Sequence, residues 1–392
     1  MSTTGRGVLI GFAEALAAPE VAASLLGAGH RVSAFSRRGR PVALGRLRSV
    51  EIFEVTPPEL DIEACRREIA ELARDHDVTM PLDDPALLIA DLALPAEATL
   101  AGPRGPRLEL ALDKRLQMRS AEAAGLAVPR WRELGAEEPG PSELGFPLML
   151  KPALAAEARG GRLVRPSPRP AADGQELRER RLALDPGTPV IAQQWLEGTG
   201  RGLFGIADRN GIHHLSAHRR VRMMNPAGSG SSACASTPVP EELIGPVGEM
   251  LMSAGWEGLF MVELLESAGR LWFMELNGRP WGSIALSRRL GFEYPAWALA
   301  RALDPGAPLP PAPPPRELLC RNLGRELVHL LFVLRGPRSA VGEWPGRAAT
   351  VRDLLGPPYR GAWYNRDPSM GGLFWYDAWQ TLAEQTWRRR GS

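Results

Sequence analysis

The chain has 392 residues, which is too many for one ordinary hydrophobic core and predicts two or three domains. Hydrophobic residues make up 44% of the chain and charged residues 23%, as is normal for a globular protein. The formal charge of +2 at pH 7 excludes the domain-wide basic excess of a nucleic-acid-binding protein. Small phosphate compounds are therefore the anions that we expect the chain to bind.

Three cysteines, Cys65, Cys234 and Cys320, lie far apart and form no CxxC or Cys/His pattern. Their odd number and wide spacing argue against a zinc site or a disulfide framework, so we expect free thiols. The first residues, 1–6, lack the apolar core of a signal peptide, and no apolar run reaches the length of about 18 residues that spans a bilayer. We therefore expect a cytoplasmic protein without a membrane span. Its frequent Ala, Arg, Gly and Pro are typical of bacterial coding bias.

The first hundred residues alternate between short apolar runs and helical segments. This pattern predicts an α/β domain with a parallel, doubly wound sheet. The expected strands are 7–12, 31–36, 49–55 and 78–82, and the expected helices are 19–26 and 60–75. The first turn, at 11–14, lacks the GxGxxG motif, which argues against a dinucleotide site there.

Asp83 and Asp84 follow the last of these strands, where an open α/β sheet places its ligands. One interpretation is therefore a contact with a substrate. The other is capping of the helix that begins at Pro85, because Asp is a favoured capping residue. We favour capping.

Beyond residue 102 the pattern becomes mixed. A helix is expected at 113–124, ended by Gly125, and a buried strand at 146–151. Residues 152–189 are polar and predict a mobile loop with a helix near 174–184. The remaining expected elements are a strand at 190–195, a hairpin at 202–216, a small-residue loop at 225–237, a helix at 241–254, a hairpin at 259–277 and a helix at 283–290.

A proline-rich spacer at 303–315 precedes a C-terminal region that holds five of the eleven tryptophans. Residues 372–390 could form a helix with several aromatic side chains and a basic end. This helix could cap a substrate pocket, pack at a dimer interface or touch anionic lipid. Packing against its own chain is the interpretation that we favour.

The hairpin at 261–283 carries the most informative pattern. Residues 266–270 supply a turn with Gly269 at its centre, which places Glu263 opposite Glu275. Strand alternation puts Asn277 on the same face as Glu275. Like charges directly across a strand pair are destabilising unless a cation lies between them, and oxygen ligands of this kind suit Mg²⁺. The alternative is an exposed hairpin with scattered acids. Arg279, just beyond, could bind a phosphate or a substrate carboxylate.

The motif Glu-Leu-Asn-Gly-Arg-Pro-Trp-Gly-Ser at 275–283, about a dozen residues after Glu263, resembles the metal-binding core of the ATP-grasp superfamily. It is most similar to the carboxylate–amine ligases related to carbamoyl-phosphate synthetase. Further motifs of the family follow in order: Asp113-Lys114 with Gly125 and Pro129, the FPLMLKP strand at 146–152, and QQWLEG at 193–198. The resemblance covers roughly residues 100–305.

This resemblance implies an ATP-grasp fold (α/β and α+β) behind an N-terminal doubly wound domain. The implied boundaries are 1–105 for the N-terminal domain, 106–192 for the small ATP-grasp subdomain, 193–305 for the metal and phosphate subdomain, and 306–392 for the proline-rich linker and the C-terminal region. The implied cofactors are ATP and Mg²⁺, with Mn²⁺ as a possible substitute.

The resemblance also implies roles for ATP-binding residues. Lys114 and Lys151 match the two lysines that hold ATP phosphates. Gly160 and Gly161 lie where the family has a glycine-rich phosphate loop, although this copy lacks the usual hydroxyl residues and contains Glu157. The residues that would line the adenine and ribose are Gln194, Trp195, Leu196 and Glu197.

A basic cluster at 218–222 precedes the small-residue loop. The family places an arginine here against the γ-phosphate or the acyl phosphate. Strand alternation puts Arg220 and Arg222 on one face, and we favour both, with a solvated basic face as the alternative. The loop that would close over the substrates contains Ser229, Gly230, Ser231 and Ser232. Cys234 is expected to be a small buried residue rather than a nucleophile.

The implied reaction has two steps. A carboxylate attacks the γ-phosphate of ATP, and an amine then displaces phosphate to form an amide. The expected partners are therefore a small carboxylate and an amine, and a homodimer is possible. Two alternatives stay open: an ATP-grasp kinase that stops after phosphoryl transfer, and a non-catalytic nucleotide-binding module.

Overall fold

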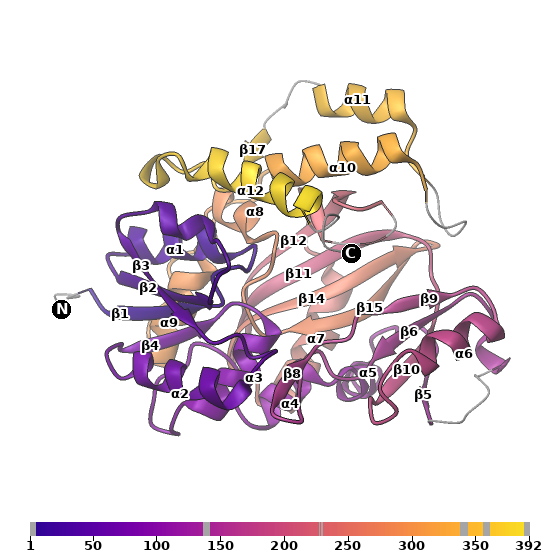
Figure 1. Cartoon of the computed structure of the whole chain (residues 1–392), viewed down its shortest axis with the longest axis horizontal. Coiled ribbons are helices and arrows are strands. Elements are labelled where there is room, and N and C mark those ends of the chain that lie inside the picture. The colour runs from indigo at the N-terminus through magenta and orange to yellow at the C-terminus, as the bar shows by residue number, and fades with distance from the viewer. Residues whose placement is uncertain are drawn as a thin grey trace.

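The computed structural model describes residues 5–135, 142–226, 228, 230–337, 344–355 and 361–387. Their strands form three larger sheets and one short hairpin. In Figure 1 the N-terminal sheet lies on the left, the largest sheet in the centre, and a smaller sheet on the right, with the C-terminal helices across the top. Three short 3₁₀ helices complete the described elements: Ala43–Arg46, Ser142–Leu144 and Pro368–Met370.

The N-terminal domain is the predicted parallel sheet. Its strands are β1 (Gly7–Gly11), β2 (Arg31–Arg37), β3 (Val50–Val55) and β4 (Val78–Pro81), in the order β3-β2-β1-β4. Its helices are α1 (Ala18–Gly27), α2 (Ile62–Ala73) and α3 (Asp84–Ala93). All five residues of β1 are buried, because helices cover both faces of a doubly wound sheet. Asp83 caps α3, accepting a hydrogen bond from the Ala86 amide at 2.8 Å, so the capping interpretation is confirmed for this residue.

The smaller sheet has the order β5-β10-β6-β9. Its strands are β5 (Trp131–Leu134), β6 (Leu148–Pro152), β9 (Arg169–Ala171) and β10 (Val190–Gln194), and the nearby helices are α4 (Pro106–Leu112), α5 (Lys114–Ala123) and α6 (Gly174–Leu182).

Part of the segment predicted as a mobile loop is instead a hairpin of β7 (Glu157–Arg159) and β8 (Arg162–Val164). Gly160 and Gly161 both have positive φ, which suits the two-residue turn between these strands. Leu163 and Ala156 pack into the core of the N-terminal domain. The polar composition of the segment gave no sign of this packing, and so the hairpin was not predicted.

The largest sheet has the order β15-β14-β11-β12-β13-β16-β17. Its first five strands in the chain are β11 (Thr199–Asp208), β12 (Gly211–Met223), β13 (Ser231–Thr237), β14 (Gly258–Ser267) and β15 (Arg270–Asn277), and its helices are α7 (Glu241–Ser253), α8 (Ile284–Arg289) and α9 (Tyr294–Leu303). The prediction of a loop throughout 225–237 is wrong for β13. Its small residues fit between β12 and β16, and Ser232, Ala233 and Cys234 have no exposed surface.

The two faces of this sheet belong to different cores. On one face Val262, Phe273 and Leu276 pack with residues of α7. On the other face Met261 and Phe204 pack with Trp281 and with α1, α8 and α9. This second face also carries the polar residues described below, because residues paired across adjacent strands point to the same side.

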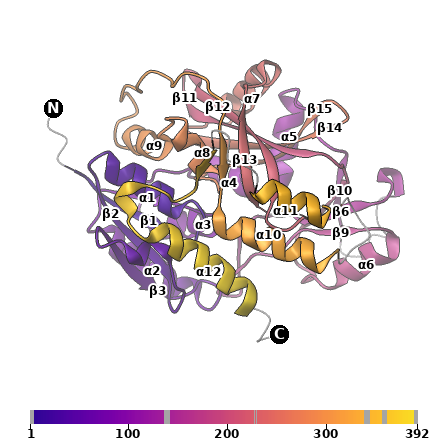
Figure 2. The ribbon, with the colours of Figure 1, turned by 90° about the horizontal axis from the view of Figure 1, so that it is seen from above.

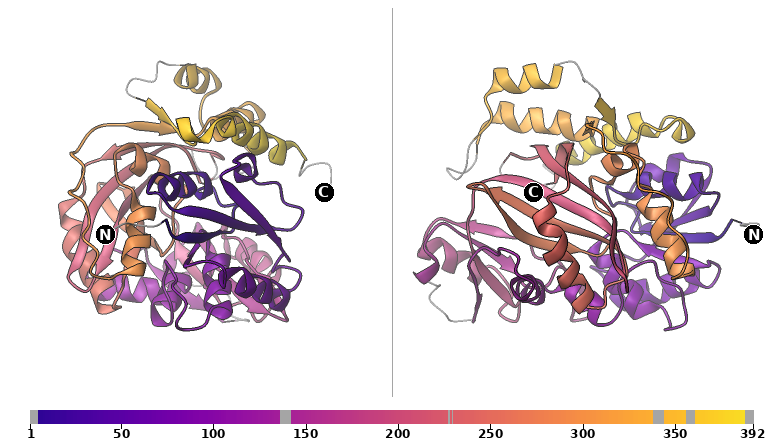
Figure 3. Two further views of the ribbon diagram at one scale, coloured as in Figure 1. Left: turned by 90° about the vertical axis from the view of Figure 1, so that its left-hand side faces the viewer. Right: turned by 180° about the vertical axis from the view of Figure 1, so that it is seen from behind.

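The C-terminal region continues the largest sheet. Its strands β16 (Leu319–Arg321) and β17 (Gly361–Trp363) extend the edge at β13, and its helices are α10 (Leu323–Arg335), α11 (Arg347–Leu355) and α12 (Leu373–Trp387). Figure 2 shows these helices from above, and the right-hand view of Figure 3 shows them over the large sheet. Helix α10 contacts β13, and α12 contacts the 3₁₀ helix Ala43–Arg46 of the N-terminal domain.

Packing of the C-terminal helix on its own chain is confirmed for Leu373, which is fully buried, whereas Trp375 and Trp379 are largely exposed. Residues 388–390 of the predicted helix lie outside the described residues. No helix of the described residues is long and apolar enough to cross a membrane.

A buried carboxylate fixes α10 to the sheet. Glu326 is 2% exposed, and both of its oxygens accept hydrogen bonds from Arg222 of β12, at 2.7 and 3.1 Å. Arg321 donates a further bond at 3.0 Å. Burial alone would raise the pKa of Glu326, but the hydrogen bond and charge of Arg222 lower this pKa below the ordinary 4.5.

Glu326→Gln is expected to destabilise the protein by about 3–5 kcal/mol, because it leaves two arginines without their buried counter-charge. The pKa of Glu326 is depressed in the folded state, so its contribution to stability is present above pH 4.5 and disappears as the pH falls through the folded pKa. Thermal unfolding at several pH values checks this. The variant should lose most stability at neutral pH and least in acid, whereas Glu317→Gln, at an exposed site, should match the wild type.

Candidate functional site

The β14–β15 hairpin brings two glutamates face to face. Glu263 of β14 pairs directly with Glu275 of β15, which confirms the predicted register, and Asn277 pairs with Met261 on the same strands. The turn that produces this register differs from the expected one, which is symmetric about Gly269. The turn occupies Ala268 and Gly269, both with positive φ, and Ser267 pairs with Arg270.

A β-bulge corrects the register between the turn and the glutamates. Next to the turn Leu264 pairs with Phe273, and continuing that register would place Met274 opposite Glu263. The pairing shifts by one residue at this point, so Glu275 takes the position instead. Phe273 can therefore enter the core of one face while Glu275 lies on the other.

Cations surround the two carboxylates. The Nζ of Lys114 lies 3.1 Å from an oxygen of Glu275, and a guanidinium nitrogen of Arg220 lies 2.8 Å from an oxygen of Glu263. Burial lowers the pKa of Lys151, Glu275 raises it, and the charge of Lys114 lowers it, with a net shift below the usual range. The structure thus brings Lys114, Lys151 and Arg220 together around the glutamate pair, and the phosphate-binding roles that the resemblance implies for them stay predictions.

The position of Lys114 follows from local structure. Asp113 caps α5, and its carboxylate accepts a hydrogen bond from the Arg115 amide at 2.8 Å. The Lys114 amide donates to the carbonyl of Ala153, just beyond β6, at 2.8 Å. The start of α5 is thereby fixed beside the strand that carries Lys151.

Two glycines of β11 allow side chains to cross this strand. β11 lies between β12 and β14, so Arg220 must pass over it to reach Glu263. A Cβ atom at Gly200 would lie 2.6 Å from the Cδ of Arg220, and one at Gly202 would lie 2.8 Å from the Nε2 of His218. Burial lowers the pKa of His218 to about 3, so this imidazole is neutral. Sequence reasoning missed the role of these glycines, although their alternation along a strand was a visible signal.

The donor set fits a magnesium–polyphosphate group. Two opposed carboxylates and the buried amide of Asn277 are oxygen donors of the type that Mg²⁺ prefers, and three cations beside them suit phosphate oxygens. Among the described residues no three His, Cys, Asp or Glu side chains converge to hold a metal by themselves. Oxygens of a bound nucleotide would therefore have to complete the coordination, as is usual for Mg²⁺.

Arg279 makes an interdomain contact that the sequence did not indicate. Its Nε lies 3.0 Å from an oxygen of Asp84 in the N-terminal domain, and Arg165 lies 3.3 Å from the other oxygen. Burial would raise the pKa of Asp84, but the charge of Arg279 and its hydrogen bond lower this pKa below the usual range. The second aspartate after β4 therefore holds an arginine of the metal-site motif, while Asp83 caps the helix.

Arg220 and Arg222 have different partners. The pairing of β12 with β13 shifts between these two residues, so simple strand alternation does not hold across this stretch. Arg220 contacts Glu263, whereas Arg222 is paired with the buried Glu326 of α10. The local alternation could not reveal this, because Glu326 is 104 residues away in the chain.

The other predicted ATP-binding residues lie at the edges of the site. Gln194 is the last residue of β10, and the segment after it links the smaller sheet to β11 of the largest sheet. Within this segment the Trp195 amide donates a hydrogen bond to the Pro147 carbonyl, and Glu197 is exposed. The adenine role of Gln194, Trp195, Leu196 and Glu197 stays a prediction. The carbonyl of Gly161 accepts a hydrogen bond from Ile62 of α2 at 2.9 Å, so the turn at Gly160 and Gly161 contacts the N-terminal domain.

The predicted substrate loop lies beneath the C-terminal region. Ser229 lies outside the described residues. Gly230 closely approaches the Arg325 side chain, and the Ser231 carbonyl accepts a hydrogen bond from Arg325. Ser231 and Ser232 are buried residues of β13, and the Ser232 carbonyl accepts from the Asn322 amide. Cys234 is also buried, and burial raises the pKa of its thiol, in agreement with a residue that is not a nucleophile.

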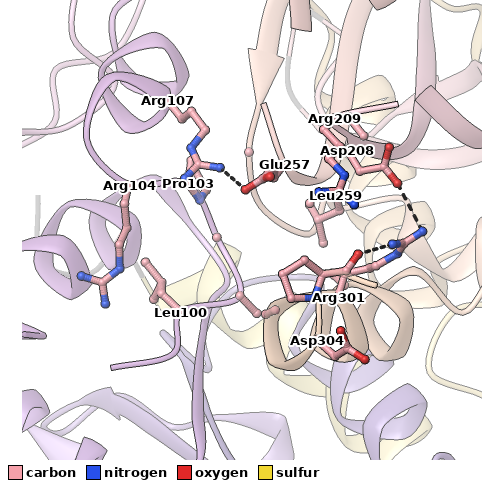
Figure 4. A pocket seen from close by; sticks show the side chains of 18 of the residues that line it. Leu100, Pro103, Arg104, Arg107, Asp208, Arg209, Glu257, Leu259, Arg301 and Asp304 are labelled. Atoms are coloured by element: carbon pink, nitrogen blue, oxygen red, sulfur yellow. Dashed lines mark hydrogen bonds and ion pairs between the residues drawn. The ribbon is translucent and has the colours of Figure 1, made fainter. Parts of the chain in front are cut away.

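Two cavities differ in their relation to this site. The larger, of about 750 Å³, lies between the 100–107 segment, the β11–β12 turn and α9. Two ion pairs lie along it (Figure 4): Arg107 with Glu257, and Arg301 with Asp208. This cavity contains none of the predicted site residues. The smaller, of about 420 Å³, is lined by Gly200, Arg220 and Arg222, and Arg220 also contacts Glu263.

Solved structures of known proteins share the fold of this chain. No family model and no curated protein sequence matches the chain. An L-amino acid ligase from Bacillus licheniformis aligns over 77% of this chain and 75% of its own, with a TM-score of 0.58 and 19% identity. N5-carboxyaminoimidazole synthetase from Staphylococcus aureus, complexed with ADP, aligns over 79% and 80% (TM-score 0.59, 15% identity). The biotin carboxylase domain of the Hydrogenobacter thermophilus 2-oxoglutarate carboxylase, complexed with MgADP, ADP and bicarbonate, aligns over 79% and 72% (TM-score 0.59, 15% identity).

Gly200→Ala is expected to leave the fold intact and displace Arg220 from Glu263, because the new methyl group would meet a flexible side chain rather than backbone. Gly198→Ala would instead place its methyl group 2.1 Å from the backbone oxygen of Glu266 and should lower the melting temperature. Thermal unfolding together with fluorescent-nucleotide binding checks this, with Gly245→Ala, at an open helical site, as control. Wild-type nucleotide affinity in the folded Gly200→Ala variant would contradict the role of Arg220.

Proposed function

From the ATP-grasp fold that this chain has in common with these ligases, we propose that it is an ATP-dependent ligase that joins a carboxylate to an amine. The observation that carries the proposal is the pairing of Glu263 with Glu275 among three cations. Two half-buried acids that face each other on neighbouring strands repel, and a bound cation would use the pair. A site made of two acids and three cations suits a nucleoside triphosphate with its metal, and its described residues include no activated nucleophile of the protein.

Each residue has a role in this proposal. Glu263, Glu275 and Asn277 would hold Mg²⁺, which supplies neutralisation of the charge on the phosphates. Lys114, Lys151 and Arg220 lie beside these acids and would bind phosphate oxygens. Arg279, oriented by Asp84, is the remaining cation of the motif and would bind the substrate carboxylate or its acyl phosphate.

The chemistry requires positioning more than covalent help. An oxygen of the substrate carboxylate attacks the γ-phosphorus of ATP, the bond to the bridging oxygen breaks, and ADP leaves. The amine nitrogen then attacks the acyl carbon, the carbon–oxygen bond breaks, and phosphate leaves with a proton. Cations fixed before the reaction stabilise the charge that moves between these oxygens. The buried and protonated Cys234 has no part in this scheme.

The reaction class is tested by supplying ATP, Mg²⁺ and an equimolar mixture of proteinogenic amino acids, which serve as both carboxylates and amines. A ligase releases ADP and free phosphate in equal amounts and forms a product with an amide bond, which mass spectrometry detects. Release of ADP without free phosphate would show a kinase. The same screen is then extended to other carboxylates against other amines.

Glu275→Gln is expected to lower ADP formation by about 100-fold or more, because one charged ligand of the metal and phosphate site is lost. Circular dichroism should show an unchanged fold. Glu266→Gln on the same hairpin is the control, since Glu266 pairs with Arg201 near the turn and should keep most of the activity. Equal activities of the two variants would rule out the proposed metal site.

A further inference from the structure

The cavity of about 420 Å³ lies between the largest sheet and the C-terminal helices α10 and α11. One wall consists of the ends of β11 and β12, with Gly200 and Arg220. The other consists of α10 and α11, with His329, Thr350 and Asp353. Arg220 contacts Glu263 at 2.8 Å, so the cavity adjoins the proposed metal site. Its volume suits a small organic molecule.

His329 has a fixed tautomer. Its Nδ1 lies 2.7 Å from the carbonyl oxygen of Met223, which can only accept, so Nδ1 carries the hydrogen and donates it. In a neutral ring, Nε2 then has a free lone pair. Among the described residues Nε2 has no hydrogen-bond partner, and it is not one of the fully enclosed polar atoms. His329 lines the cavity, and Nε2 is the ring nitrogen left without a partner in the described part of the chain.

The surroundings of His329 favour the neutral ring. Burial lowers its pKa; the Met223 carbonyl and Glu326 act in the opposite direction, and Arg222 acts with burial, for a net shift below the ordinary value. Besides Arg222 and His329, the charged or titratable side chains among the described residues of the cavity wall are Arg220 on β12 and Asp353 on α11. The ring is therefore uncharged at neutral pH.

Asp353 is the one acid among the described charged side chains of the cavity wall, and the arginines there have acidic partners of their own. Arg220 is paired with Glu263 and Arg222 with Glu326, so the acids beside the cavity balance these arginines. Asp353 supplies the remaining charge. Its neighbour Arg352 is 3.8 Å away and 80% exposed, where such a pair is strongly screened. A protonated primary amine of about amino-acid size fits this charge and volume.

We propose that this cavity binds the amine substrate and that Nε2 of His329 accepts a proton from its ammonium group. The inference rests on the ligase function proposed above. The ammonium gives one proton to His329, and the freed lone pair attacks the acyl phosphate carbon. The carbon–nitrogen bond forms as the carbon–oxygen bond breaks. The second nitrogen proton leaves with the phosphate, and His329 returns its proton to solvent.

His329→Asn tests the proton transfer, because an asparagine amide can still donate to Met223 while the proton acceptor is lost. Two nucleophiles are compared in the full chain across pH: the amino-acid mixture, protonated at neutral pH, and hydroxylamine, which is not. We expect amide formation with amino acids to fall by about 10²–10⁴-fold at pH 7. The loss should shrink as the pH rises, and hydroxamate formation should change little.

His76→Asn is the matched control. His76 also places its Nδ1 2.7 Å from a backbone carbonyl, that of Leu72, but it lies on the N-terminal domain away from the cavity. This variant should behave as the wild type with both nucleophiles. A loss in His329→Asn that is equal for both nucleophiles, or independent of pH, would show a structural role and overturn the inference.

Asp353→Asn provides an independent test at an exposed position, where the substitution should leave the fold unchanged. The KM for the amino-acid mixture should rise severalfold, with kcat nearly unchanged, and an unchanged KM would count against the cavity as the amine site. Failure of this inference is distinct from failure of the proposed function. In the first case the wild type still forms amides and the variants do not differ from it; in the second the wild type forms none.

Discussion

The repulsion between two opposed glutamates is the constraint on which the rest of the structure depends. Glu263 and Glu275 are directly paired on one sheet face, and a pair of like charges there destabilises a hairpin unless cations compensate it. Compensation comes from three separate elements: Lys114 at the start of α5, Lys151 on β6 and Arg220 on β12. The small sheet and the large sheet are thereby tied together electrostatically at the point where chemistry is proposed.

The C-terminal region is a structural part of this site rather than an appendage. Two of its strands extend the largest sheet, and Glu326 of α10 neutralises Arg222 beside the cavity. The same helix carries His329, one turn further along, where i and i+3 residues share a face. A single helical face therefore fixes the region to the sheet and supplies the imidazole that faces the cavity.

Local periodicity predicted much of the fold and part of the site. The parallel N-terminal sheet follows from short apolar strands between helices, and the pairing of Glu263 with Glu275 follows from the hairpin pattern. The contacts of Asp84 with Arg279 and of Arg222 with Glu326 could not be predicted, because they join residues 195 and 104 positions apart. The strand β13 was also missed, since its small residues owe their conformation to neighbouring strands rather than to their own pattern.

The bulge at Met274 has a consequence for the length of the hairpin. Glutamates twelve residues apart face each other here because one residue is extra; with the same two-residue turn, an unbroken ladder would oppose residues eleven apart. A single insertion or deletion between the two acids would turn one of them toward the α7 core, unless the bulge or the turn changed with it. The spacing of acids along the chain is thus a property of hairpin geometry, and chains with the same pair of ligands can carry them at different intervals.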